Sequence, residues 1–227
     1  MIENIAVYLE IGSKKTFAGA LDWPGWCRSG KDDSAALQNL LDYARRYEAI
    51  LKPNNFGFAI PQELNQFKVI ERLKGGATTD FGSPGAVPSQ DQHTMNEAEL
   101  DRSLGFLRAF WSAFDKTVKK ATGRILTTGT RGGGRDLERI VQHVVGGDDA
   151  YLRSIGWKPV VATSETLEKQ LDQIRRDVVA GLTACAHGEL PAKGPRGGIR
   201  WKPRYFVRRS GWHVLDHAWE IEDRIVR

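Results

Sequence analysis

Residues Trp212 to Arg224 read WHVLDHAWEIEDR and decide how the rest of the chain is interpreted. The stretch contains no glycine or proline, so it is expected to be helical. His213 and His217 are four residues apart and therefore stack one turn above the other on one helix face. Two imidazoles at this spacing can bind one metal ion. Apolar residues flank them on both sides, which predicts that both histidines point into a protein core.

Two further polar residues continue the stripe of the histidines. Glu220 and Arg224 follow at helical spacing, and Glu220 is the candidate catalytic residue. It could serve as a general base or orient a ligand histidine, and a plain salt bridge to Arg224 is equally compatible with the spacing. Arg224 is a candidate substrate-binding residue. Asp216 is expected on the outer, solvated side of the helix.

A third histidine lies in another segment with a helical pattern, Asp136 to Ile155. His143 is followed there by Gly146 and Gly147, which indicate either a kink or the close approach of a second helix. Three histidines from two helices would leave coordination positions open for chemistry on a bound ion. Zn²⁺, Ni²⁺, Mn²⁺ and Fe²⁺ all suit such ligands. The alternative is that these are ordinary hydrogen-bonded histidines. His93 and His187 are expected to be exposed.

Composition limits the class of protein. The chain has 227 residues, 41% hydrophobic and 27% charged, which is typical of a globular protein with one large or two small domains. No apolar run approaches the roughly 20 residues of a membrane span, and the N-terminus does not resemble a secretory signal. Cys27 and Cys185 form no CxxC pair, so we expect reduced thiols in a cytoplasmic protein.

The pattern along the chain predicts an α+β protein with two domains. Residues 1–74 contain β-compatible segments (Ile2 to Ile11, Thr16 to Leu21, Trp26 to Ser29, Phe67 to Leu73) and one helix from Asp32 or Asp33 to about Tyr47. Residues 75–93 are rich in glycine and proline and are interpreted as a linker or an ordered loop between the domains. Residues 94–227 show helical periodicity in four segments, which predicts an up-down four-helix bundle. Its first helix is expected to begin at a capping box of Thr94 and Glu97.

Basic residues gather in two loops. Between Lys193 and Arg209 there are seven lysines and arginines and no acidic residue, which favours an anionic partner. Trp201 and Arg204 in this stretch are candidate substrate-binding residues at the rim of a pocket. Arg131 and Arg135 flank a triple glycine before the segment of His143, and they could hold an anionic group near the start of that helix. A solvated loop is the alternative for this pair.

The C-terminal part resembles the DinB-like superfamily, over roughly Met95 to Arg227, with the closing HVLDHAWEIEDR as its most specific match. The resemblance implies a four-helix bundle in which His143, His213 and His217 bind one divalent metal. Several branches of that superfamily transfer a low-molecular-weight thiol, so such a thiol is a candidate second cofactor. Membership does not by itself fix the reaction, because a fold hosts many chemistries.

The N-terminal part is similar to the small ββαβ domain of HicB-like antitoxins, over about Met1 to Leu51. The match is TFAGALDWPGWCRSG, from Thr16 to Gly30, followed by a helix. No DNA-binding module is evident at the end of this sequence, so this domain is expected to mediate dimerisation or to cover the site.

Two functions are therefore weighed. The preferred one is a metal-dependent transferase or hydrolase, of the thiol S-transferase type, acting on a small and anionic molecule. The alternative is a non-enzymatic module that binds nucleic acid or protein through the basic loop 193–209 and the HicB-like domain. No recognised nucleic-acid motif accompanies that loop.

Overall fold

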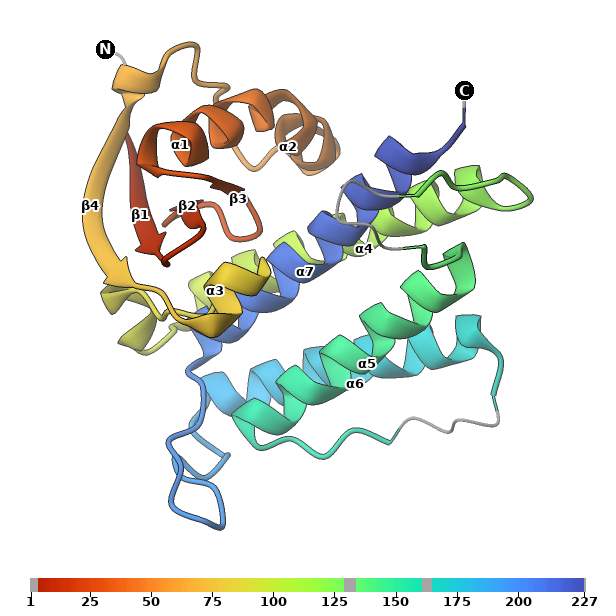
Figure 1. Cartoon of the computed structure of the whole chain (residues 1–227). Helices are drawn as coiled ribbons and strands as arrows, with labels where there is room; N and C mark the ends of the chain where they lie inside the picture. The colour runs from red at the N-terminus through yellow and green to blue at the C-terminus, as the bar shows by residue number, and fades with distance from the viewer. Residues whose placement is uncertain (1–3, 129–133, 161–164, 227) are drawn as a thin grey trace. The chain divides into compact units, whose positions relative to one another are not determined.

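The computed structural model describes residues 4–128, 134–160 and 165–226. The chain divides into two compact units, Met1–His93 and Thr94–Arg227, which we call the first unit and the helical unit. The described strands of more than one residue lie in the first unit and the four long helices in the other, so the expected α+β class is confirmed (Figure 1).

The first unit is built on a four-stranded mixed sheet in the order β3-β2-β1-β4. The central strand β1 (Ile5–Ile11) pairs antiparallel with β2 (Thr16–Ala20) and parallel with β4 (Phe67–Lys74). Strand β3 (Cys27–Gly30) completes the antiparallel edge. All four strands were expected from the sequence, with ends that differ by at most three residues.

Two helices follow β3 where the sequence predicted one. Helix α1 (Asp33–Asp42) is capped by Asp32, and α2 (Ala44–Leu51) follows after Tyr43. Helix α1 packs on β2 and β3, and the fully buried Trp26 donates its indole N–H to the Leu40 carbonyl at 2.9 Å. Trp26 also stacks on Tyr47, with ring centroids 5.6 Å apart. These aromatic contacts hold the helices against the sheet.

The Gly/Pro-rich segment 75–93 belongs to the first unit, which ends at His93. It contains α3 (Ala77–Phe81) and a 3₁₀ turn, Ser89–Gln92. Glu10 of β1 is completely buried and accepts hydrogen bonds from the Thr79 hydroxyl and from the backbone N–H groups of Gly85 and Ala86. Buried carboxyl oxygens need such donors, so these hydrogen bonds fix the segment on the sheet.

The helical unit consists of α4 (Glu97–Ala121), α5 (Leu137–Ile155), α6 (Leu167–Ala186) and α7 (Pro203–Arg224). Helix α4 packs mainly on α7, while α5 packs on both α6 and α7. Phe110 and Phe114 of α4, Leu152 of α5 and Leu182 of α6 are fully buried. From Tyr205 to Trp219 every residue of α7 is buried. A helix covered all round must satisfy its polar side chains within the protein.

The predicted capping box of the first long helix was two residues too early. Asn96, not Thr94, is the N-cap, and it exchanges hydrogen bonds with Glu99 at 2.9 and 3.0 Å. Both pairs have the spacing of a capping box. Glu97 contacts His187 instead, and the Thr94 carbonyl accepts from Arg204.

None of the described helices is both long and apolar enough to cross a bilayer.

Asp148 of α5 is an acidic side chain in the interior of the helical unit. It is 2% exposed, and its Oδ1 has no hydrogen-bond partner. Burial raises the pKa of this carboxyl to about 7, although the positive charge of Arg175 acts in the opposite direction. The folded protein therefore binds a proton at Asp148 that the unfolded chain releases at much lower pH.

This proton makes the stability of the protein depend on pH. The contribution of Asp148 is fully present below the unfolded pKa of 3.8 and is lost as the pH rises through about 7. From about pH 5 to about pH 8 the free energy of unfolding should fall less in Asp148→Asn than in the wild type, because asparagine cannot ionise. Urea denaturation at both pH values measures this, with Asp149→Asn as the neighbouring control. An unchanged pH dependence in Asp148→Asn would contradict the assignment.

Candidate metal centre

The three histidines singled out in the sequence meet between α5 and α7. His143 comes from α5, His213 and His217 from α7, and one ligand atom from each lies within 4.8 Å of the other two. The ring centroids are 4.7 to 5.0 Å apart. Nε2 of His213 is 3.2 Å from Nε2 of His143. Two nitrogen ligands of a tetrahedral Zn²⁺ lie about 3.3 Å apart, given Zn–N bonds of about 2.0–2.1 Å.

His217 is oriented by a carboxylate. Its Nδ1 lies 2.8 Å from Oε2 of Glu220, an arrangement that places the ring proton on Nδ1 and leaves the lone pair of Nε2 available. The other carboxylate oxygen, Oε1, accepts from Nη1 of Arg224 at 2.7 Å. The hydrogen bond from His217 and the positive charge of Arg224 outweigh burial and lower the pKa of Glu220 to about 2.

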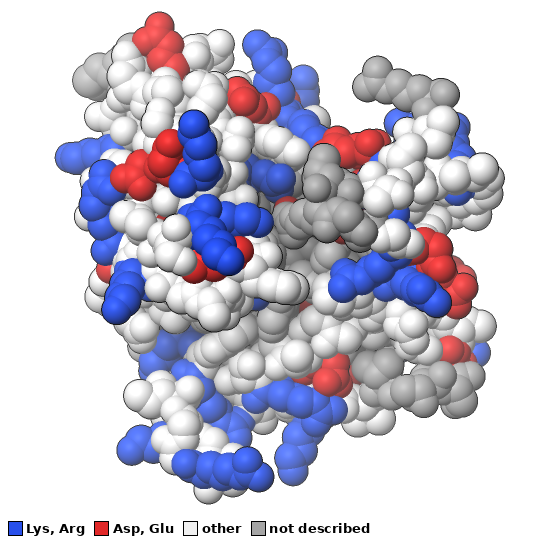
Figure 2. All heavy atoms as spheres, in the orientation of Figure 1, with Lys and Arg blue, Asp and Glu red and all other residues white. Residues whose placement is uncertain are grey.

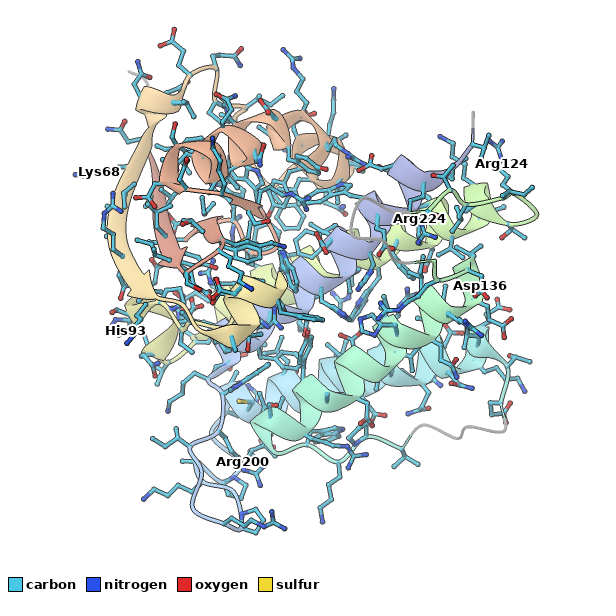
Figure 3. All side chains as sticks on the ribbon, viewed as in Figure 1. Lys68, His93, Arg124, Asp136, Arg200 and Arg224 are labelled. Carbon is cyan, nitrogen blue, oxygen red and sulfur yellow. The ribbon has the colours of Figure 1, made fainter. Side chains whose placement is uncertain are left out.

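Arg224 ties this pair to the chain that precedes α5. The side chain is 4% exposed, its Nε donates to the Thr127 carbonyl and its Nη2 to the Arg135 carbonyl, both at 2.7 Å. Figure 3 shows Arg224 near the end of α7 and Asp136 at the start of α5. Arg224 thus holds Glu220, and through it His217, in a fixed position relative to α5.

Electrostatics keep two of the imidazoles uncharged at neutral pH. Burial, followed by the neighbouring His217 and Arg135, lowers the pKa of His143 to about 4. Burial and the same kind of neighbours lower the pKa of His213 well below its usual value. Only a neutral imidazole binds a metal, so the two rings are in the required protonation state near pH 7.

The hydrogen bonding of His213 suits a metal ligand better than a structural histidine. The residue is 5% exposed, its Nδ1 is buried without a hydrogen-bond partner, and its Nε2 faces another imidazole. Two imidazole nitrogens that face each other at 3.2 Å suit a shared cation, which Nε2 of His213 would bind together with His143 and His217. His143 is exposed, so the centre has a side that small molecules can reach.

Gly147 explains why α5 carries a glycine pair. A Cβ atom at position 147 would lie 2.3 Å from Cε1 and 2.7 Å from Nδ1 of His213. The absence of a side chain therefore makes room for the imidazole. The helix continues through Gly146 and Gly147 without interruption, and the close approach of a second helix, one of the two alternatives, is observed at Gly147.

Of the remaining candidate residues, some lie near the three histidines and others do not. Arg135 is exposed, and its charge acts on His143 and His213. Arg131 lies outside the described residues. Trp201 contacts Tyr151, with ring centroids 5.3 Å apart, and Tyr151 in turn lies 5.5 Å from His213. Arg204 does not reach the histidines, because its guanidinium contacts Glu99 and the Thr94 carbonyl.

Two features of the sequence were interpreted incompletely. Asp216 was expected to be solvated, but it is 8% exposed, because α7 is covered on every side. Tyr151 was missed, although it follows His143 by eight residues and so lies on the same face of α5. Extending the helical spacing beyond the histidines would have found it. His93 and His187 are exposed, as expected.

Comparison of the chain with models of protein families, with curated proteins and with solved structures gave no match. The geometry of the three histidines and their neighbours is therefore what indicates a metal centre.

The glycine pair offers a matched test of this geometry. We expect Gly147→Ala to displace the His213 ring and to lower metal affinity, whereas Gly146→Ala meets no other residue within 4 Å. Gly146→Ala should leave metal binding unchanged and raise helix stability by up to about 1 kcal/mol. Metal titration and thermal unfolding of both variants measure the two effects. Equal metal affinity in the two variants would show that His213 does not need this space.

Proposed function

We propose that the chain is a divalent-metal-binding protein of the DinB-like type, in which α4 to α7 form a four-helix bundle around the centre of His143, His213 and His217. The observation that carries the proposal is the convergence of three imidazoles from two helices, two of them buried. All three ligands are imidazole nitrogens, a set that suits Zn²⁺, Ni²⁺, Mn²⁺ or Fe²⁺.

The proposed activity is that of a transferase or hydrolase acting on a small molecule. A divalent ion held by three imidazoles lowers the pKa of a bound water or thiol, which supplies a nucleophile near neutral pH. A low-molecular-weight thiol is the second cofactor that we propose. The positive charge of Arg135 beside His143 favours an anionic substrate at the exposed side of the centre.

The role of Glu220 follows from its contacts. Both carboxylate oxygens are engaged, one by His217 and one by Arg224, and a pKa of about 2 makes this carboxylate a weak base. Orientation of His217 is therefore the role that we propose for Glu220, in preference to general-base catalysis. For the first unit we propose a HicB-like domain that serves in dimerisation.

The alternative function uses the basic loop. Residues Lys193 and Ile199 form a bridge in a hairpin, and lysines and arginines gather on the projecting loop at the bottom of Figure 2. However, Arg208 and Arg209 are buried and Arg204 contacts Glu99. Lys193, Arg196 and Lys202 are the exposed cations that remain for phosphate contacts. A gel-shift assay with RNA and DNA at low salt tests this alternative, which predicts salt-sensitive binding.

Metal analysis tests the main proposal. Protein purified without a histidine tag should contain about one equivalent of a divalent metal. His213→Ala and His217→Ala should each remove it, whereas His187→Ala, at an exposed histidine that contacts Glu97, should not. Elemental analysis of all four proteins decides the matter. Stoichiometric metal in both His213→Ala and His217→Ala would rule out the centre.

Substitution of Glu220 tests the proposed orientation of His217. Glu220→Gln keeps the shape but loses the charge, and we expect a loss of metal affinity of about 10-fold to 100-fold. Glu222→Gln, on the same helix but bonded to Thr117, should change it little. Competition with a coloured chelator measures both affinities. If Glu220→Gln binds metal as tightly as the wild type, Glu220 does not orient a ligand.

A further inference from the structure

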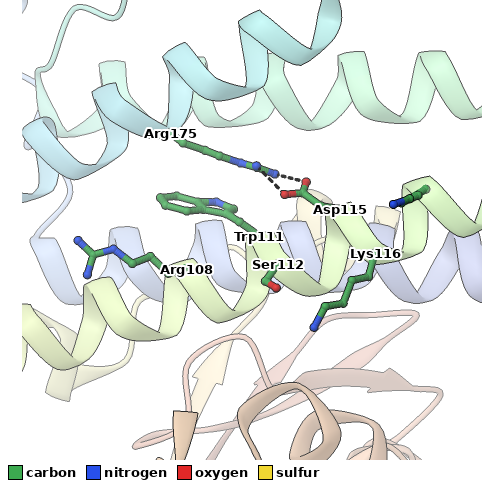
Figure 4. Close-up of a pocket in the computed structure, with 7 residues that line it drawn as sticks. Arg108, Trp111, Ser112, Asp115, Lys116 and Arg175 are labelled. Carbon is green, nitrogen blue, oxygen red and sulfur yellow. Dashed lines mark hydrogen bonds and ion pairs between the residues drawn. The ribbon is translucent and has the colours of Figure 1, made fainter. Parts of the chain in front are cut away.

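A basic groove between α4 and α6 lies outside the metal centre. It has a volume of about 410 Å³ and is lined by Trp111, Ser112, one carboxylate and four cations (Asp115, Arg108, Lys116, Lys119 and Arg175). Figure 4 shows Arg175 of α6 reaching across to Asp115 of α4, with Trp111 beside it and Arg108 and Lys116 farther along α4. None of these residues belongs to the metal centre.

The cation in the wall of the groove is held in place. Arg175 forms two parallel hydrogen bonds with Asp115, at 2.6 and 2.9 Å, and its guanidinium lies 5.6 Å from the centre of the Trp111 ring. Its side chain is only 16% exposed. Nε of Arg175 is buried without a hydrogen-bond partner. A guanidinium fixed in this way is pre-organised, unlike the flexible side chains of a solvated helix face.

The other cations extend the charge along α4. Arg108, Lys116 and Lys119 are exposed, and with Arg175 they leave the groove with three positive charges in excess over Asp115. Arg108 and Lys119 are eleven residues apart, which is about 16 Å along a helix. This row suits several negative charges in a chain better than a single small anion.

We propose that the groove binds a small molecule that carries a chain of phosphate groups. Its volume is within the range of small-ligand sites, at roughly 300–1,000 Å³. Single-stranded nucleic acid is a poorer fit, because binding of that kind uses aromatic faces for stacking. Trp111 is buried and has Arg175 over its ring. The phosphate chain, not a base, is therefore the recognised part.

Calorimetric titration at low salt tests this proposal with tripolyphosphate, ATP and adenosine as probes. Tripolyphosphate and ATP should bind with similar affinity and adenosine should not bind. The double substitution Lys116→Gln with Lys119→Gln should weaken binding at least about tenfold, the effect of losing charge-assisted contacts. Lys120→Gln, exposed on the same helix but outside the groove, should change the affinity less than about twofold.

A substitution that is expected to tighten phosphate binding provides a second check. Asp115→Asn removes the negative charge of the groove but keeps an amide oxygen that can accept from Arg175. It should therefore tighten phosphate binding, whereas Asp101→Asn, about 21 Å away along α4, should not. All titrations are repeated in His213→Ala, so that chelation of a bound metal cannot produce the signal. The proposal is overturned if the wild type binds no phosphate chain, if Lys120→Gln weakens binding as much as the double variant, or if only long RNA or DNA binds.

Discussion

Two imidazoles buried on one helix are the constraint from which the helical unit is best understood. Helix α7 is covered on all sides, so His213 and His217 must find polar partners inside the protein. One partner is His143, which α5 brings to the same place. Another is Glu220, which is itself held by Arg224 and, through that arginine, by the chain before α5. The packing of α5 on α7 therefore also supplies the polar partners that the buried histidines need.

The charges around the histidines favour unprotonated ring nitrogens, whose lone pairs can bind a metal. Arg135 and burial act against protonation of His143, and the single carboxylate that contacts His217 is already shared with Arg224. A carboxylate without Arg224 would attract a proton to the rings more strongly. Elsewhere in the same core the protein carries Asp148, whose pKa is raised by the same lack of water. The lowered pKa of His213 and the raised pKa of Asp148 both come from placing ionisable groups where little solvent can reach them.

Much of this arrangement could be predicted from local patterns, and the failures have physical causes. The spacing of His213 and His217, the helical context of His143 and the four strands are short-range signals, and the structure has each of them. The capping box was misplaced because two candidate pairs have identical spacing, and only contacts from Arg204 and His187 separate them. Likewise, composition alone left a linker and an ordered loop both open at 75–93, because Glu10, the side chain that accepts hydrogen bonds from this segment, is distant in sequence. Burial of Asp216 depends on how many elements surround α7, which no local pattern contains.

The unequal exposure of the three histidines has a kinetic consequence. His213 and His217 are enclosed and can leave their positions only if helices move, whereas the ring of His143 is at the surface. Under the proposed function, release of an ion would begin with rotation of this outer ring, a motion of side-chain timescale that needs no unfolding. Exchange with a chelator would then require loss of the His143 contact and not opening of the core. The affinity of the centre and the lifetime of its occupant would thus be governed by different residues.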